Sequence, residues 1–441
     1  MAARRNLVVG LGKTGLSAAR WLAAQGESVT VNDSRAAPPG LDGLRKLGSA
    51  VVARLGGFDL SLLDGADRIV LSPGVARSEP IICAALARGL AVLGDVELFA
   101  QAVRAPAVAI TGTNGKSTAT TLVADMARAA GRTVLAGGNL GDPALDLLAA
   151  PVPDLYVLEL SSFQLECTDS LALAAAAVLN VTPDHMDRYE AVADYAAAKA
   201  RIFAHAAVAV VNLDDPVVAR MAPAASRKVG FSLVRADADW GLVTVAGRTG
   251  LARAGKSLLP LEDLKLPGRH NAANALAALA IGEAIGLPLE PMLATLRTFA
   301  GLPHRTQWVA DRQGVRYIND SKGTNVGATL AAVAGLDQRL VVIAGGDGKD
   351  QDFAPLAAAF RGTVRHAVLI GRDRALLAGA LAGACPTEFA PDLPAAVLAA
   401  SKAAQPGDLV LLSPACASLD MFRDYAERGD IFAAAARRLD A

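Results

Sequence analysis

The stretch AVAITGTNGKST, residues 107–118, leads from a short apolar run through a glycine-rich turn to a lysine and two hydroxyl side chains. The apolar run predicts a buried strand, and residues 117–130 predict a helix that Gly131 ends. In such a turn, backbone amides and the lysine surround a phosphate group, and the Ser117 hydroxyl can bind Mg²⁺. Ile110 stands where the general motif has its first glycine, so an ordinary capped helix start is the alternative. The stretch favours a nucleotide-binding α/β domain.

Apolar runs alternate with helix-like stretches on both sides of this loop, which predicts parallel sheets buried by helices on both faces. The other runs cover residues 7–10, 29–31, 68–71, 90–93, 156–160, 176–181, 208–213, 315–318, 340–344, 367–370 and 409–412. Residues 228–261 are richer in β-type and turn residues and predict a small antiparallel excursion. We expect an α/β fold of three domains: a Rossmann-like domain over 1–95, a P-loop ATPase-type domain with a mostly parallel sheet over 96–301, and a C-terminal Rossmann-like domain over 302–441.

The composition excludes several classes of protein. Of the 441 residues, 53% are hydrophobic and 20% are charged, which excludes a disordered chain. The 43 Lys and Arg residues balance the 43 Asp and Glu residues, so no global field favours nucleic acid or a membrane surface. The apolar run 171–179 is too short to cross a membrane. The four cysteines, scattered without a CxxC pair, predict buried free thiols. We therefore expect a protein of the cytoplasm with no nucleic-acid partner and no membrane insertion, and separately we expect a monomer.

A second glycine-rich turn, GLGKTG at residues 10–15, lies between a predicted strand and a predicted helix. Its glycines allow a diphosphate to approach the helix N-terminus, and Asp33 at the end of the next strand is placed to bind a ribose hydroxyl. Alone, the motif would suggest an NAD-dependent dehydrogenase, but it indicates only a nucleotide that carries a diphosphate. A tight turn that needs glycine for packing is the alternative.

Several polar residues follow predicted strands, where open α/β sheets bind their ligands. Glu159 ends an otherwise apolar strand and would bind Mg²⁺ beside Ser117, or form a salt bridge. By residue type alone, His185 is a loop histidine and Lys199 a surface lysine on an otherwise apolar helix. In the third predicted domain, two lysines and a threonine could hold a dicarboxylate, and Arg305 could bind a phosphate.

Eight motifs in order resemble those of the Mur ligases, the ATP-dependent amide ligases of bacterial peptidoglycan synthesis. They are TGTNGKST, LELSSFQLE, NVTPDHMDRY, GRHNAANALAA, GLPHR, NDSKGTN, GGDGKDQDF and SPACASLD, and they cover nearly the whole chain. The last four look most like the member that adds D-glutamate to UDP-N-acetylmuramoyl-L-alanine. The shortened phosphate loop is the form that this family uses.

The resemblance implies a role for each matching position. ATP would be bound by Gly112, Thr113, Asn114, Gly115, Lys116, Ser117, Thr118, Asn271, Asn274, Arg305 and Asp320. Two Mg²⁺ ions would be held by Ser117, Glu159, His185 and Lys199, the lysine being carbamylated, and the catalytic residues would be Lys116, Glu159, His185 and Lys199. The UDP-sugar would be bound by Thr14, Asp33, Ser34, Arg35, Gly74 and Asn139, with no NAD. D-Glutamate would be bound by Lys322, Thr324, Lys349, Ser418, Leu419 and Tyr425, the last a tyrosine where phenylalanine is usual in the family.

The expected reaction activates an inert carboxylate before an amine attacks it. ATP would phosphorylate the alanyl carboxylate, and the amine of D-glutamate would then displace phosphate from the acyl phosphate. Three alternatives are open: a related Mur or folylpolyglutamate-type ligase for another amino acid, an NAD-dependent dehydrogenase, and a non-catalytic nucleotide switch. The dehydrogenase leaves the phosphate loop unexplained, and a switch does not need both Lys116 and Glu159.

Overall fold

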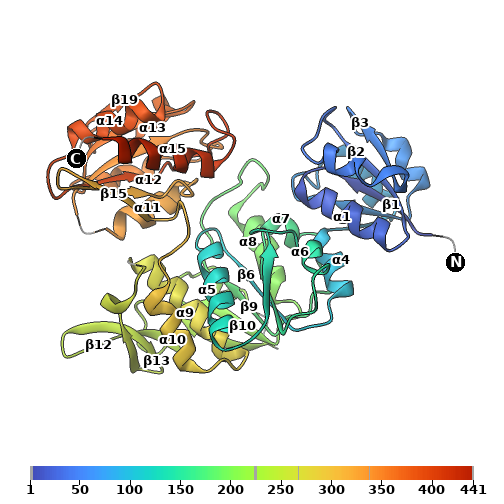
Figure 1. Cartoon of the computed structure of the whole chain (residues 1–441), viewed down its shortest axis with the longest axis horizontal. Coiled ribbons are helices and arrows are strands. Elements are labelled where there is room, and N and C mark those ends of the chain that lie inside the picture. The colour runs from blue at the N-terminus through green and yellow to red at the C-terminus, as the bar shows by residue number, and fades with distance from the viewer. Residues whose placement is uncertain (1–2, 223–225, 267, 337, 440–441) are drawn as a thin grey trace.

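The computed structural model describes residues 3–222, 226–266, 268–336 and 338–439. Three α/β bodies follow one another along the chain, each built around its own sheet, and the N-terminal and C-terminal bodies both adjoin the middle one (Figure 1). The predicted fold class, with three domains of mostly parallel sheet, is confirmed.

The N-terminal sheet contains five parallel strands in the order β3-β2-β1-β4-β5, which is the order of a Rossmann-like fold. Its strands are β1 (Arg5–Val9), β2 (Ser28–Asp33), β3 (Val51–Leu55), β4 (Arg68–Leu71) and β5 (Ala91–Leu93). Its helices are α1 (Lys13–Ala24), α2 (Leu41–Arg45) and α3 (Pro80–Ala87). The glycine-rich turn at residues 10–12 leads from the central strand β1 into α1, as predicted.

The middle sheet contains nine strands in the order β14-β13-β12-β11-β10-β9-β6-β8-β7. Its strands are β6 (Ala107–Thr111), β7 (Val134–Gly138), β8 (Leu155–Glu159), β9 (Ala175–Val178), β10 (Val208–Asn212), β11 (Arg227–Phe231), β12 (Trp240–Val245), β13 (Arg248–Arg253) and β14 (Lys256–Pro260). Its helices are α4 (Asp95–Ala102), α5 (Lys116–Ala129), α6 (Ala144–Leu147), α7 (Ser162–Leu165), α8 (Val192–Ala200), α9 (Arg269–Ala284) and α10 (Leu289–Thr298). The strands β12, β13 and β14 pair antiparallel, which confirms the predicted excursion.

The C-terminal sheet contains six strands in the order β15-β16-β20-β17-β18-β19. Its strands are β15 (Gln307–Arg312), β16 (Val315–Asn319), β17 (Leu340–Gly345), β18 (Val364–Ile370), β19 (Thr387–Phe389) and β20 (Leu409–Leu412). Its helices are α11 (Val326–Ala334), α12 (Ala354–Phe360), α13 (Arg374–Ala380), α14 (Leu393–Ala403) and α15 (Tyr425–Arg438). The edge strand β15 forms an antiparallel hairpin with β16, and the other pairs are parallel.

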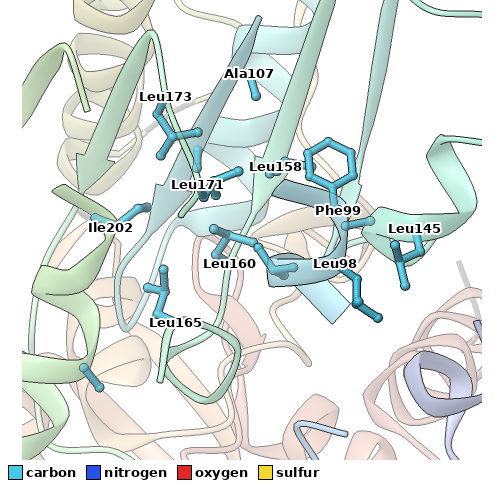
Figure 2. Packing of buried hydrophobic residues seen from close by; sticks show 14 of the residues in the cluster. Leu98, Phe99, Ala107, Leu145, Leu158, Leu160, Leu165, Leu171, Leu173 and Ile202 are labelled. Atoms are coloured by element: carbon cyan, nitrogen blue, oxygen red, sulfur yellow. The ribbon is translucent and has the colours of Figure 1, made fainter. Parts of the chain in front are cut away.

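The N-terminal and middle bodies share one apolar core. A single cluster of buried side chains runs from Leu22 and Val31 in the first body to Phe99 and Leu158 in the second. Figure 2 shows part of it, where Leu98 and Phe99 of α4 lie near Leu145, Leu158 and Leu160. The two C-terminal clusters contain only residues from 309 to 436. Apolar packing therefore joins the first two bodies, and the third has its own core.

Two expectations need correction or completion. All four cysteines are free, but Cys83 is exposed and Cys385 is half-buried, so only Cys167 and Cys416 are the buried thiols that were expected. The strands β3, β7, β15 and β19 were not predicted. Within the described residues, the helices are all too short or too polar to cross a membrane.

Candidate active site

The phosphate loop lies where the sequence predicts it, between the buried strand β6 and helix α5. Gly115 has a φ of +83°, and a Cβ atom there would lie 2.3 Å from Oδ1 of Asn274 on α9. Only glycine fits both demands. The Nζ of Lys116 folds back over the loop and donates to the carbonyl oxygens of Gly112 and Thr113, both at 2.9 Å.

Glu159 ends β8, the strand beside β6, and is only 2% exposed. It accepts hydrogen bonds from Ser117 Oγ at 2.5 Å and from Asn139 Nδ2 at 2.6 Å. From the C-terminal body, the Nη2 of Arg305 donates to the same Ser117 oxygen at 2.5 Å. The end of the phosphate loop therefore joins a hydroxyl, a carboxylate and a guanidinium.

Lys199 is not the surface residue that its helix pattern alone favoured, because it is only 1% exposed. Its Nζ donates to the carbonyl oxygen of Gly112 at 2.9 Å and lies 4.4 Å from the centre of the Tyr195 ring. Burial lowers the pKa of Lys199 well below its ordinary value, and the nearby Lys116 lowers it further. Burial therefore makes the charged amine less favourable here than on an exposed lysine.

His185 and Asp184 follow strand β9 in the loop that faces Lys199. The His185 ring meets the Phe163 ring edge-on, with 4.9 Å between centroids, and burial lowers its pKa. Asp184 is 6% exposed and accepts from Nζ of Lys349 at 2.8 Å and from Nδ2 of Asn325 at 3.1 Å. Burial alone would raise the pKa of Asp184, but the charge and hydrogen bond of Lys349 outweigh it and hold that pKa below its ordinary value.

Two cavities adjoin this group of site residues. The first, which we call the central cavity, has a volume of about 390 Å³ and is lined by residues of all three bodies. The predicted site residues that line it are Gly74, Thr113, Asn114, Gly115, Lys116, Asn139, Glu159, His185, Lys199, Arg305, Lys322, Thr324 and Lys349. The structure thus brings together residues that were predicted for four different ligands.

The second, which we call the side cavity, has a volume of about 280 Å³ and lies between the middle and C-terminal bodies. The predicted site residues that line it are Asn114, Gly115, Thr118, Asn271, Asn274, Arg305, Asp320 and Lys322. Burial raises the pKa of Asp320 to about 6, and its oxygens accept from Thr306 N at 3.1 Å and Ser413 Oγ at 2.8 Å. Since Arg305 and Lys322 line both cavities, the two spaces adjoin at these side chains.

Some predicted residues lie outside both cavities. Thr14, Asp33, Ser34 and Arg35 are in the N-terminal body. Asp33 accepts from Leu11 N at 2.6 Å and from the Arg35 guanidinium at 2.8 and 2.9 Å. Burial opposes ionisation of Asp33, but these bonds lower its pKa to about 2. A ribose hydroxyl that binds Asp33, as we expect, would have to share this carboxylate with Arg35.

Three residues predicted for the amino acid also lie outside the lining of the central cavity. Ser418 is buried, whereas Leu419 is exposed. Tyr425 begins α15, and its ring centre lies 3.8 Å from Nζ of Lys322. Burial lowers the pKa of Lys322 to about 8, and the neighbouring Arg305 and Lys116 contribute to the shift. Tyr425 therefore does not line the central cavity itself but contacts Lys322, which does.

The sequence reasoning missed several residues that line the central cavity. Asp184 and Asn325 join the middle and C-terminal bodies, and Arg188 lies over the Phe163 ring, with 4.1 Å from its guanidinium carbon to the ring centre. Asp184 and Asn325 belong to the motifs NVTPDHMDRY and NDSKGTN. Both lie in polar loops that follow strands, Asp184 after β9 and Asn325 after β16, and this position was the signal that could have identified them.

The oxygen atoms of Ser117 and Glu159 suit Mg²⁺, which prefers hard oxygen ligands and completes its shell with phosphates and water. His185 has the neutral ring that a metal ligand needs, and the buried amine of Lys199 is the form that reacts with CO2 to give a carbamate. Within the described residues, no group of three or more His, Cys, Asp and Glu side chains gathers into a metal cluster. The donor set therefore fits a metal ion that is shared with bound phosphate.

Known proteins match this chain along nearly its whole length. Three family descriptions match it: the Mur ligase MurD-like N-terminal domain over residues 4–94, the Mur ligase middle domain over 110–282, and the Mur ligase glutamate ligase domain over 304–416. The UDP-N-acetylmuramoylalanine–D-glutamate ligase of Nitrosococcus oceani is 53% identical over 99% of this chain and 97% of its own. The protein of the same name from Marinobacter nauticus is 51% identical over 97% of both chains. The solved structure of the UDP-N-acetylmuramate–alanine ligase MurC from Thermotoga maritima is 19% identical, covers 98% of this chain and 99% of its own, and has a TM-score of 0.63, so it shares the fold.

Proposed function

The chain belongs to the Mur ligase family, and from this premise we propose that it uses ATP to join D-glutamate to UDP-N-acetylmuramoyl-L-alanine in peptidoglycan precursor synthesis. The relatives that are 53% and 51% identical over nearly their full length bear the name of that reaction. A related ligase for another amino acid is the alternative that the assay below separates.

The central cavity is the observation that carries the proposal. In it, the phosphate loop and Glu159 of the middle body face Lys322 and Lys349 of the C-terminal body and Gly74 of the N-terminal body. A ligase with three substrates needs such a meeting point, because holding the reacting groups together supplies much of the rate enhancement. A dehydrogenase that used only the GLGKTG turn would need none of these residues.

In the first step, the alanyl carboxylate attacks the γ-phosphorus of ATP, and ADP leaves as the acyl phosphate forms. Two anions must approach each other, so positive charge in the loop is required. Lys116 supplies it, and the phosphate in turn favours the charged form of a lysine whose pKa is lowered by burial. Two Mg²⁺ ions, held by Ser117 and Glu159 and by His185 and carbamylated Lys199, would neutralise further phosphate charge when bound.

In the second step, the neutral amine of D-glutamate attacks the acyl carbon, a tetrahedral intermediate forms, and phosphate leaves. Lys322, Thr324 and Lys349 are the side chains of the C-terminal body that line the central cavity beside Arg305 and Asn325. Lysines bind carboxylates as point charges, so this pair suits the two carboxylates of D-glutamate. Ser418, Leu419 and Tyr425 complete the proposed amino-acid site.

The remaining assignments belong to the same proposal. ATP would occupy the side cavity against Asn271, Asn274, Arg305 and Asp320, with its phosphates in the loop at 112–118. The UDP-sugar would extend from Thr14, Asp33, Ser34 and Arg35 past Gly74 to Asn139. We divide the chain into a UDP-sugar domain (1–95), an ATP domain (96–301) and an amino-acid domain (302–441). We expect a monomer in the cytoplasm, where bacteria keep ATP and nucleotide sugars.

The test is ATP turnover with UDP-N-acetylmuramoyl-L-alanine, with the amino acid varied over D-glutamate, L-glutamate, L-lysine and diaminopimelate. Phosphate release that depends on D-glutamate, with the dipeptide product detected by mass, is the expected result. Release that depends on another amino acid would favour the related ligase, and no amino-acid-dependent release would contradict the proposal.

The Lys116→Ala variant tests the role of the phosphate loop within this reaction. Because the variant lacks the cation of the loop, we expect no acyl-phosphate formation, whereas binding of the UDP-sugar in a calorimetric titration should persist. Full turnover in this variant would refute the role assigned to Lys116.

A further inference from the structure

The central cavity contains more basic than acidic side chains. Apart from Lys199, which we propose to be carbamylated, the basic residues that line it are Lys116, Arg188, Arg305, Lys322 and Lys349, and among its described lining residues the acids are Glu159 and Asp184. Such a cavity attracts the carboxylates of an amino acid but repels its ammonium group. An amino acid that enters therefore needs an acidic side chain to receive that ammonium.

Glu159 is already committed to other groups. Ser117 and Asn139 donate to its two oxygens at 2.5 and 2.6 Å, and the proposed Mg²⁺ site uses the same carboxylate. Asp184, by contrast, already binds a primary ammonium group, as the substrate nitrogen would be. The Nζ of Lys349 donates to Asp184 Oδ1 at 2.8 Å, and this lysine belongs to the proposed amino-acid site.

The carboxylate of Asp184 is held rigidly for this contact. Its own loop fixes Oδ1 through the backbone N–H of His185 at 3.0 Å, and Nδ2 of Asn325 donates to Oδ2 at 3.1 Å. The side chain is 8% exposed, so an ammonium that binds there is largely removed from water. Under such conditions an ion pair is screened little, and its geometry selects the ligand.

We propose that Asp184 is the residue that binds the ammonium group of the incoming amino acid, an inference that rests on the proposed function. Lys349 turns from Asp184 to a substrate carboxylate, and the substrate ammonium takes its place on Asp184. One ion pair is thereby replaced by two, and neither buried charge is left alone, which would be costly. The amino acid is thus recognised at both ends, with its nitrogen fixed beside the reacting centre before it loses its proton.

A pair of ligands tests this assignment without any mutation. Glutarate has the two carboxylates of D-glutamate but no amine. Both are titrated into the wild-type protein at one pH by calorimetry, with UDP-N-acetylmuramoyl-L-alanine and a non-hydrolysable ATP analogue present. Since a buried charge pair is at stake, we expect glutarate to bind at least about 30-fold more weakly than D-glutamate. Equal affinity for the two ligands would overturn the proposal.

Two variants then test which residue causes the preference for D-glutamate over glutarate. In Asp184→Asn we expect D-glutamate to lose at least about 30-fold in affinity, while glutarate does not weaken, because its binding to the wild-type protein takes Lys349 away and leaves Asp184 without a partner. In Lys349→Met both ligands should weaken together, because the lost contact is to a carboxylate. Glu190→Gln, which removes an exposed carboxylate from the same segment, is the matched control and should leave both affinities unchanged.

A structural role for Asp184 would give a different pattern. Asp184→Asn would then weaken D-glutamate and glutarate by the same factor, and that result would overturn the proposal. Turnover of the wild-type protein with D-glutamate is measured first. If no turnover occurs, the proposed function fails; if turnover occurs but the protein does not discriminate between the two ligands, only the assignment of Asp184 fails.

Discussion

At the scale of single residues, the Lys199 amine lies where its charged form is disfavoured by burial. It is buried beside the Tyr195 ring and close to Lys116, and its pKa is well below the ordinary value. A neutral amine is the form that attacks CO2. We therefore expect the protein, in buffer with ¹³C-labelled bicarbonate, to show a carbamate signal by NMR that disappears in Lys199→Arg.

A variant of an exposed lysine serves as the control for non-specific labelling. Lys402 is exposed on α14, so Lys402→Arg should keep the carbamate signal at its full intensity. A signal that survives in Lys199→Arg would place the carbamate on another lysine, and its absence in the wild-type protein would refute the modification.

Lys322 should make carboxylate binding depend on pH. Its pKa is lowered to about 8, against about 10.4 for a free lysine, so the charge is lost as the pH rises through 8. The inhibition constant of glutarate, which has no titrating amine, should therefore rise above pH 8, approaching tenfold per unit. Lys322→Arg keeps its charge and should remove this dependence. A constant that does not change from pH 7 to 9 in the wild type would contradict the role of Lys322.

The same shift affects stability with a definite sign. Below about pH 8 the folded state bears the full cost of the buried charge of Lys322. Between about 8 and 10.4 the unfolded chain binds more protons than the folded one, so this residue makes the protein more stable as the pH rises. Lys322→Met should remove this contribution, which chemical unfolding at pH 7 and pH 9.5 can measure.

Local motifs identified the residues of the site that lie close together in the chain. Lys116 and Ser117 were predicted from residue type, because a strand, a glycine turn and a helix fix their positions within one short stretch. Asp184 and Lys349 are 165 positions apart, and only the packing of the middle and C-terminal bodies brings their atoms to 2.8 Å. Likewise, Lys199 is buried with its amine on the carbonyl oxygen of Gly112 in the phosphate loop, 87 positions away, and the periodicity of its own helix does not predict that contact.

At the scale of elements, the turn between β6 and α5 depends on Gly115. Gly115→Ala would place a Cβ atom 2.3 Å from Asn274 Oδ1 at a φ of +83°. We expect a loss of about 1–3 kcal/mol in the free energy of unfolding and weaker ATP binding, because Asn274 lines the side cavity. Thermal unfolding and calorimetric titration of ATP measure the two effects.

Gly131, at the end of α5, has the same φ of +83°, but a Cβ atom there would meet none of the described residues within 4 Å. Gly131→Ala therefore introduces the backbone strain without the clash, and should lower stability by about 1–2 kcal/mol while leaving ATP affinity unchanged. If the two variants bound ATP equally well, the contact between Gly115 and Asn274 would have no part in nucleotide binding.

The four strands that were not predicted share one property: they are all edge strands. β3 and β7 each end a sheet, and β15 and β19 form the two edges of the C-terminal sheet. The middle residues of β3 are exposed, unlike those of the central strand β1. A central parallel strand is covered on both faces and reads as a continuous apolar run, whereas an edge strand does not need one. Periodicity therefore predicted the buried strands and missed these edges.

At the scale of the whole molecule, two kinds of junction hold the three bodies together. The first and second share one apolar cluster, which runs from Leu22 and Val31 of the first body to Phe99 and Leu158 of the second. The second and third are joined by polar contacts around the site, such as Arg305 with Ser117 and Lys349 with Asp184. Since apolar burial is the larger stabilising contribution, the first two bodies should unfold as one unit.

Two phenylalanines that are both 0% exposed test this prediction. Phe99 belongs to the shared cluster and Phe432 to a C-terminal cluster, so each change to alanine should cost about 3–5 kcal/mol. In Phe99→Ala, hydrogen exchange measured by mass spectrometry should accelerate in both β1–β5 and β6–β10, with the C-terminal sheet unaffected. In Phe432→Ala, it should accelerate in β15–β20 alone. Faster exchange of only one of the first two sheets in Phe99→Ala would mean that these bodies unfold separately, despite the core that they share.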